Sequence, residues 1–88
     1  MIRLTGTMRC APDEAEAVRS ALPEHIRLTR AEPGCIAFEI SETAPGVFTV
    51  RELFADASAF EIHQDRTPSS DWWKITGHMT RDFRRSTE

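Results

Sequence analysis

The sequence predicts an α+β fold in which helices cover one face of an antiparallel sheet. Four segments alternate between apolar and polar residues, which is the pattern of half-buried strands. Between them lie a segment with apolar residues at helical spacing and another that opens on a helix-capping residue. The 88 residues are 40 % hydrophobic and 28 % charged, as in an ordinary globular protein, and suffice for one core. We therefore expect a single domain over residues 1–88.

The N-terminal part of the chain is expected to form a strand and then a long helix. Residues 2–9 alternate, and the inward side consists of Ile2, Leu4, Gly6 and Met8. Pro12 suits the first position of a helix, and the acidic residues after it favour the positive end of the helix dipole. The expected inner stripe of this helix is Ala15, Val18, Leu22 and Ile26. Pro23 removes one backbone hydrogen bond at a cost of about 3 kcal/mol, so we expect a kink or a break there.

A hairpin is expected next. The Glu-Pro-Gly sequence at 32–34 ends the helix, and residues 35–43 then alternate, with Ile36, Phe38 and Ile40 on one side. Residues 44–46 read Ala-Pro-Gly, a composition typical of a tight turn. Residues 47–55 alternate again, and the two strands should pair.

The C-terminal third is expected to form a second helix, a short helical segment and a last strand. Asp56 can cap the second helix, which contains Phe60 and His63. Residues 67–70 interrupt it, and a short segment with two tryptophans follows and ends at Gly77. Residues 78–85 alternate sufficiently to predict a fourth strand.

This order of elements, βαββαβ, predicts a ferredoxin-like fold with an antiparallel sheet. Right-handed crossovers place both helices on the same face of the sheet and leave the other face open. The third strand has large apolar residues on both of its sides, Phe48, Val50 and Phe54 on one and Val47 and Leu53 on the other. We therefore expect the open face to be covered by a second copy of the chain in a homodimer.

Charge and composition narrow the function classes. A net charge of -3 gives no positive field for nucleic acid or anionic lipid, so neither is an expected partner. The N-terminal residues form no apolar signal segment and no long apolar stretch follows, which predicts a cytoplasmic protein outside the membrane. Cys10 and Cys35 lack CxxC spacing and are expected to be free thiols, and no metal-ligand spacing is present.

Two stretches of the chain share their pattern with a known family. Residues 32–39 read Glu-Pro-Gly-Cys-Ile-Ala-Phe-Glu, and residues 52–63 run from Glu52 to His63 and are followed by Thr67 and Pro68. Both stretches resemble the antibiotic biosynthesis monooxygenase family. The resemblance implies a dimeric α+β barrel with a pocket between sheet and helices in each subunit. It also implies oxidation of aromatic or quinol-like compounds with dioxygen, without metal or flavin, so no cofactor is expected.

His63 is the expected catalytic base. It follows Phe60 by three residues on a helix, which places both on the core-facing side, and imidazole titrates near neutral pH. Oxidation by dioxygen without a cofactor requires a base that ionises the substrate hydroxyl and an apolar cavity that holds the ring. The alternative is a structural histidine at the edge of the core.

Five residues are candidates for substrate binding: Trp72, Trp73, Phe60, Glu52 and His78. Trp72 and Trp73 point about 100° apart on a helix, so we expect one of them to line the pocket. Glu52 lies between apolar residues on its strand, and it is either a buried carboxylate with a raised pKa or a structural partner of Arg3 or Arg51. His78 begins the last strand and can face solvent or the pocket.

The sequence contains no asparagine and no tyrosine. Family members that oxidise anthrones, and related haem-degrading enzymes, use these residues in their pockets, so haem degradation is disfavoured. The leading functional hypothesis is therefore a cofactor-independent monooxygenase that acts on a small aromatic or quinol-type compound. The alternative is a non-enzymatic dimeric module that binds a small hydrophobic ligand.

Overall fold

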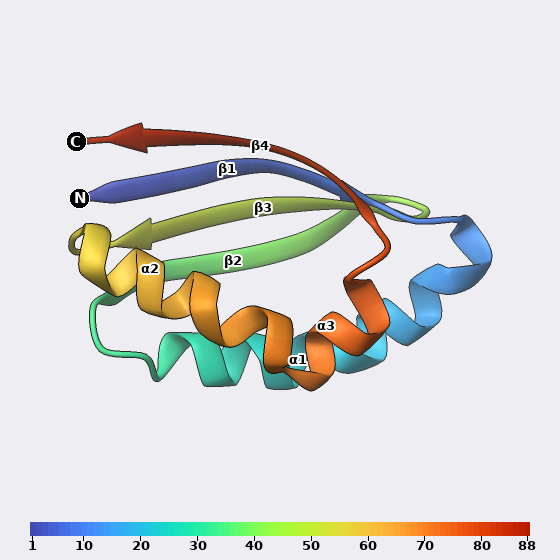
Figure 1. Ribbon diagram of the computed structural model, residues 1–88. Coiled ribbons are helices and arrows are strands. Elements are labelled where there is room, and N and C mark those ends of the chain that lie inside the picture. The colour runs from blue at the N-terminus through green and yellow to red at the C-terminus, as the bar shows by residue number, and fades with distance from the viewer.

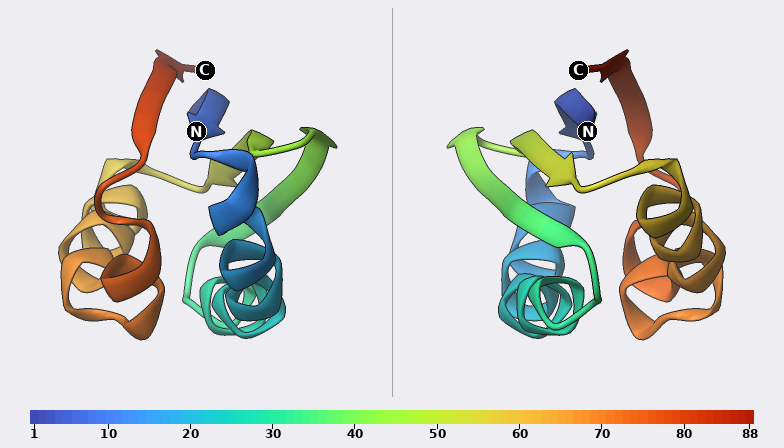
Figure 2. Two further views of the ribbon diagram at one scale, coloured as in Figure 1. Left: turned by 90° about the vertical axis from the view of Figure 1, so that its right-hand side faces the viewer. Right: turned by 90° about the vertical axis from the view of Figure 1, so that its left-hand side faces the viewer.

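The computed structural model describes all 88 residues and confirms the ferredoxin-like α+β fold (Figure 1). One antiparallel sheet has the strand order β2-β3-β1-β4. Its strands are β1 (Ile2–Arg9), β2 (Cys35–Ala44), β3 (Val47–Phe54) and β4 (Thr80–Thr87). The helices are α1 (Ala15–Arg30), α2 (Ala57–Arg66) and α3 (Asp71–Thr76), with short 3-10 turns η1 (Pro12–Glu14) and η2 (Thr67–Ser69). Figure 2 shows α1 beside the α2–α3 segment, both on the same face of the sheet.

The core lies between the sheet and this helical layer. On β3, Phe48, Val50 and Phe54 are almost completely buried, and they alternate with residues that face away from the helices. The register pairs Ile2 with Phe54 and Met8 with Phe48, so β1 contributes its own apolar side to the same face. The inward side expected for β1 is therefore confirmed, and of the two apolar sides of β3 the one with Phe48, Val50 and Phe54 faces the helices.

Helix α1 differs from the prediction in two respects. It is continuous from Ala15 to Arg30, so the predicted break at Pro23 does not occur. Pro23 is exposed, and the carbonyl that lacks its usual donor can hydrogen-bond to water instead. The buried positions of the second half are His25 and Thr29, whereas Ile26 is only half-buried.

Strand β2 contains a second correction. A β-bulge between Cys35 and Ala37 places two residues of β2 against one of β3, and Ile36 is 54 % exposed rather than inward-facing. Just before the bulge, Gly34 adopts φ +86°, and a Cβ there would lie 2.5 Å from Cβ of Ala59 on α2. The glycine thus allows the segment that leads into β2 to pack closely on α2.

The helix-ending and helix-starting signals of the C-terminal third are confirmed. The Asp56 side chain accepts a hydrogen bond from the backbone N–H of Ala59, and Ser70 caps α3 in the same way through Trp73. Gly77 ends α3. Strand β4 begins at Thr80, two residues later than predicted, because residues 77–79 turn the chain back toward the sheet.

The face of the sheet opposite the helices is open in the single chain (Figure 1). Its side chains include Arg3, Thr5 and Thr7 of β1 and Val47, Thr49, Arg51 and Leu53 of β3. Val47 and Leu53 are half-buried among these polar neighbours. The face is therefore mixed in character, and the homodimer stays a prediction. No helix has the length and apolarity that crossing a membrane requires.

Candidate functional site

A cavity of about 180 Å³ lies between the sheet and the helices. Its apolar walls come from three strands and α3, and include Leu4, Met8, Phe38, Ile40, Phe83, Trp72 and Trp73. Its polar lining comes from β3, β4 and the helical side, and comprises Glu52, Arg81, His25, His63, Gln64 and Thr67. We call this space the inner cavity. It combines a largely apolar wall with a few converging polar groups, which is the usual composition of a small-molecule site.

His63 is the centre of a buried polar network at this cavity. Its side chain is only 5 % exposed, and its ring stacks on Phe54 with 5.1 Å between the ring centroids. Nδ1 lies 3.2 Å from a carboxylate oxygen of Glu32, and Nε2 lies 3.8 Å from Oε1 of Glu52. The tautomer that carries its proton on Nδ1 donates to Glu32 and leaves the Nε2 lone pair free.

Glu32 is held in place by a cation. Arg66, in the last turn of α2, donates from Nε to Oε1 of Glu32 and from Nη2 to the hydroxyl of Thr29. Glu32 belongs to the Glu-Pro-Gly sequence, whose glycine packs against α2, so the motif brings this carboxylate to His63. The arrangement of carboxylate, imidazole and free ring nitrogen is the one that orients a histidine as a general base.

Glu52 is buried without a hydrogen bond to Oε1. Burial, together with the negative charge of Glu32, raises the pKa of Glu52 to about 8, so this carboxyl group is protonated at neutral pH. The predicted pairing with an arginine is wrong, because Arg3 binds Glu88 and Arg51 is exposed on the opposite side of β3. The buried carboxyl with a raised pKa was the other expectation.

Burial acts on the histidines in the opposite sense. It lowers the pKa of His63, while the Glu32 carboxylate opposes this shift. It lowers the pKa of His25 to about 3, and the positive charges of Arg66 and Arg81, and of His63 when it is protonated, lower it further. Both imidazoles are therefore neutral at pH 7. No group of three His, Cys, Asp or Glu side chains has a metal-binding arrangement.

The two tryptophans both line the inner cavity, although only one was expected there. Trp72 is buried and stacks on the ring of His25, with centroids 4.5 Å apart and planes 4° apart. Trp73 is half-buried, and the guanidinium of Arg81 lies 4.6 Å from its ring centroid. Trp72 is thus fixed by an aromatic partner and Trp73 by a cation.

Phe60 and His78 lie away from the inner cavity, contrary to expectation. Phe60 packs edge-on against Phe54 in the neighbouring part of the core, one turn closer to the start of α2 than His63, and it does not line the cavity. The side chain of His78 is 54 % exposed and binds Glu14, because the turn after α3 directs it to the surface. These two residues do not line the inner cavity.

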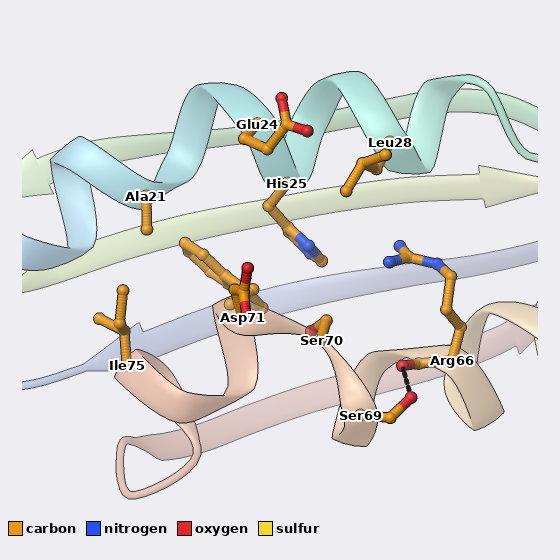
Figure 3. Close-up of a pocket in the computed structure, with 10 residues that line it drawn as sticks. Ala21, Glu24, His25, Leu28, Arg66, Ser69, Ser70, Asp71 and Ile75 are labelled. Atoms are coloured by element: carbon orange, nitrogen blue, oxygen red, sulfur yellow. Dashed lines mark hydrogen bonds between the residues drawn. The ribbon is translucent and has the colours of Figure 1, made fainter.

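A second, larger hollow of about 580 Å³ lies between α1 and the η2–α3 segment (Figure 3). We call it the outer groove. Its lining includes Ala21, Leu28 and Ile75 as well as Arg66, Ser69 and Asp71, several of which are exposed. His25 and Trp72 line both spaces, so their stacked rings form the partition between them.

Four residues of the network were not selected from the sequence as site residues: His25, Glu32, Arg66 and Arg81. A signal for His25 was present, since Ala15, Val18, Leu22, His25 and Thr29 follow the three-and-four spacing of one helix face. Glu32 was assigned to a turn, and its contact with His63 spans 31 residues of sequence. No periodicity brings such a pair together.

Comparison with models of known protein families shows the family to which the chain belongs. The family model described as "Antibiotic biosynthesis monooxygenase" matches residues 1–74. The chain belongs to the antibiotic biosynthesis monooxygenase family. The matched region includes Glu32, Glu52, His63 and Trp72, and it ends before Arg81 of β4. Family membership supports a monooxygenase. Comparison with curated proteins finds no match.

Solved structures share the fold of this family member. A candidate antibiotic biosynthesis monooxygenase from Deinococcus radiodurans is 24 % identical, with a TM-score of 0.81 over 100 % of this chain and 92 % of the other. One from Nitrosomonas europaea is 19 % identical, with a TM-score of 0.86 over 100 % and 98 %. A Mycobacterium tuberculosis protein is 21 % identical, with a TM-score of 0.79 over 99 % and 93 %. At these identities the likeness shows the fold alone.

Proposed function

We propose that this protein is a cofactor-independent monooxygenase that oxidises a small aromatic or quinol-type compound with dioxygen. The observation that carries the proposal is His63, whose Nδ1 faces the Glu32 carboxylate and whose Nε2 faces Glu52 at the apolar inner cavity. Membership of the antibiotic biosynthesis monooxygenase family supports the reaction class.

His63 acts as the base that ionises the substrate hydroxyl. Its pKa is lowered by burial, so the imidazole is neutral at pH 7 and can accept a proton at Nε2. The imidazolium formed in this way is stabilised by Glu32, which Arg66 holds in position. The resulting phenolate is electron-rich and can pass an electron to dioxygen.

Glu52 has the complementary role of a proton donor. Its raised pKa keeps it protonated at neutral pH, and it lies 3.8 Å from the base. One dihydroxybenzene and one dioxygen give one hydroxyquinone and one water. The substrate supplies all four electrons in this reaction, so the reaction as written uses no external reductant. A carboxylic acid beside the cavity supplies a proton as the reduced oxygen leaves.

The size of the inner cavity selects compounds with one aromatic ring. An engineered apolar cavity of about 150 Å³ binds benzene. The inner cavity, at about 180 Å³, has room for one ring with small substituents and not for the three fused rings of an anthrone. Trp72 and Phe38 provide flat walls for such a ring.

Oxygen uptake with a graded series of substrates tests the proposal. Purified protein is mixed with hydroquinone, methylhydroquinone and anthrone, and the rate is followed with an oxygen electrode. We expect uptake above buffer for the one-ring compounds and its loss in the His63→Ala variant. Equal rates for buffer, protein and His63→Ala would reject an enzymatic function, and ligand binding without uptake would support a non-enzymatic module that binds a small hydrophobic molecule.

We also propose that the protein is a homodimer that pairs through the open face of the sheet. Val47 and Leu53 lie on this face, and a two-fold axis buries the same patch on both copies. Sedimentation equilibrium measures the mass directly, and a Leu53→Glu substitution introduces a charge into the proposed contact. A monomeric wild type at high concentration would contradict the proposal.

A further inference from the structure

The inner cavity contains an unexplained pair of polar atoms. Among buried side-chain nitrogen and oxygen atoms, two have no hydrogen-bond partner: Nδ1 of His25 and Oε1 of Glu52. The two residues come from different elements, α1 and β3, and both line the same cavity of about 180 Å³. An arrangement that isolates two polar atoms at one small cavity requires an explanation.

Leaving such atoms without partners costs folding free energy. Buried polar groups in proteins are nearly always hydrogen-bonded, and each exception calls for an explanation such as a catalytic role, an ion or a bound water. A buried position without a partner is also one where an apolar residue would be the more stable choice. A ligand that supplies the missing hydrogen bonds accounts for both atoms at once.

The ring of His25 is fixed in its position. One face stacks on Trp72, with centroids 4.5 Å apart, and the edge of Phe38 lies against it with centroids 5.4 Å apart. The ring of His63 is its next neighbour, at 6.1 Å between centroids, and Glu52 lies beyond Nε2 of His63 at 3.8 Å. His25 and Glu52 thus both neighbour the proposed base and line one cavity.

The side chains of His25 and Glu52 are both uncharged at neutral pH. The pKa of His25 is about 3, so its imidazole is neutral, and the pKa of Glu52 is about 8, so its carboxyl group is protonated. Neutral imidazole and carboxylic acid can each donate and accept a hydrogen bond. They suit hydroxyl or carbonyl groups, and they offer no charge to hold a carboxylate or a phosphate.

We propose that His25 is a ligand-binding residue and that the inner cavity takes a one-ring compound with an oxygen substituent at each end, one bound by Glu52 and the other by His25. The proposal rests on the proposed function for its choice of an aromatic ring. It goes further in assigning a role to His25 and in requiring two polar groups on the ligand. His25 positions the ring of the ligand. The other oxygen substituent of the ligand, the one bound by Glu52, then lies at His63.

Binding of two matched probes without oxygen tests this assignment. Hydroquinone carries two hydroxyl groups and phenol carries one, and calorimetric titration under nitrogen measures both dissociation constants without turnover. We expect the wild type to bind hydroquinone about 10-fold more tightly than phenol, as one additional hydrogen bond provides. In His25→Phe, which retains a ring for Trp72 to stack on, the preference should disappear while phenol binding stays unchanged.

Two further variants separate binding from folding. His25→Leu removes the ring as well as the nitrogen, and it should also lose the preference. His78→Phe replaces an exposed histidine outside both hollows, and it should retain the wild-type preference. Circular dichroism of every variant checks that the fold is intact.

The outcomes distinguish this inference from the proposed function. Equal binding of the two probes by the wild type, or a preference that survives in both His25 variants, would overturn the role of His25 even if oxygen uptake is observed. A preference that depends on His25, in a protein without oxygen uptake, would confirm the two-ended site and reject the monooxygenase.

Discussion

The inner cavity and the outer groove share the partition of His25 and Trp72, yet they differ in almost every other property. The outer groove is about three times larger, at about 580 Å³ against about 180 Å³. Its polar groups are mostly exposed or already bonded within the chain, as the hydroxyl of Ser69 is to the carbonyl of Arg66 (Figure 3). Of the two buried polar atoms that lack a partner within the chain, Oε1 of Glu52 belongs to the inner cavity alone and Nδ1 of His25 to the partition.

The difference shows that volume alone does not identify a site. Exposed charges at the rim of a groove are solvated and screened, so they gain little from one another. Buried groups around a small apolar space have shifted pKa values because water cannot stabilise their charged forms. Chemistry is therefore expected in the smaller space, and the following predictions test this comparison.

The largest expected effect is on catalysis. His63→Ala removes the proposed base from the inner cavity, and general-base catalysis contributes about 10²- to 10⁴-fold. We expect kcat/KM for hydroquinone oxidation to fall by this factor. Ser69→Ala in the outer groove is the matched control and should leave the rate unchanged. Equal losses in the two variants would contradict the assignment of the site.

The next largest effect is expected on stability, from a substitution in the partition between the two hollows. Trp72 is buried, and replacing a buried tryptophan by alanine costs about 3–5 kcal/mol. Trp72→Ala should lower the free energy of unfolding by this amount in urea denaturation and join the two hollows. Trp73→Ala, at a half-buried position, should cost clearly less. The reverse order would show that the partition is not a structural element of the core.

Glu52 is expected to make stability depend on pH. Its pKa is raised from 4.5 to about 8 on folding, so the folded state holds a proton that the unfolded state releases. Stability from this group is therefore complete below pH 4.5 and is lost as pH rises toward 8, by up to about 1.4 kcal/mol per pH unit. The Glu52→Gln variant should lack this loss.

The two buried histidines, His25 and His63, change the pH dependence of stability in the opposite direction. The pKa of His25 falls from 6.5 to about 3 on folding, and that of His63 also falls, so both favour the folded state as pH rises to 6.5. The difference in unfolding free energy between wild type and Glu52→Gln, measured in urea from pH 5 to pH 9, isolates the carboxyl group. A difference that is constant with pH would show that Glu52 ionises normally.

The smallest effect is expected in the outer groove. Leu28 is 40 % exposed, and substitutions at such positions usually change stability by less than about 0.5 kcal/mol. Leu28→Ala should change neither the unfolding free energy beyond this limit nor the rate of hydroquinone oxidation. A large loss of activity would show that the outer groove takes part in substrate binding.

Much of the fold was predictable because local patterns are sufficient for it. The alternation on β1 selects its buried side, and the hydroxyl or carboxylate before a helix selects its first residue. Asp56 and Gly77 mark helix ends in the structure as predicted. Pro23 was misjudged because the cost of a proline in a helix depends on whether the freed carbonyl faces water.

The candidate site was only partly predictable. Glu52, His63, Trp72 and Trp73 were selected from the sequence and line one cavity, whereas Phe60 and His78 were selected and lie elsewhere. Periodicity assigns a residue to a face of its own element, and Phe60 is indeed inward-facing. It does not say which part of the core that face meets.

The amino-acid sequence by itself determined the order of elements, the buried side of β1, and the family, because these depend on near neighbours along the chain. The tertiary structure decided which groups meet at the inner cavity. Glu32 reaches His63 across 31 residues, through the close packing of Gly34 on α2. It also decided the charge states, since the pKa values of Glu52 and His25 depend on water being excluded by side chains from the whole length of the chain.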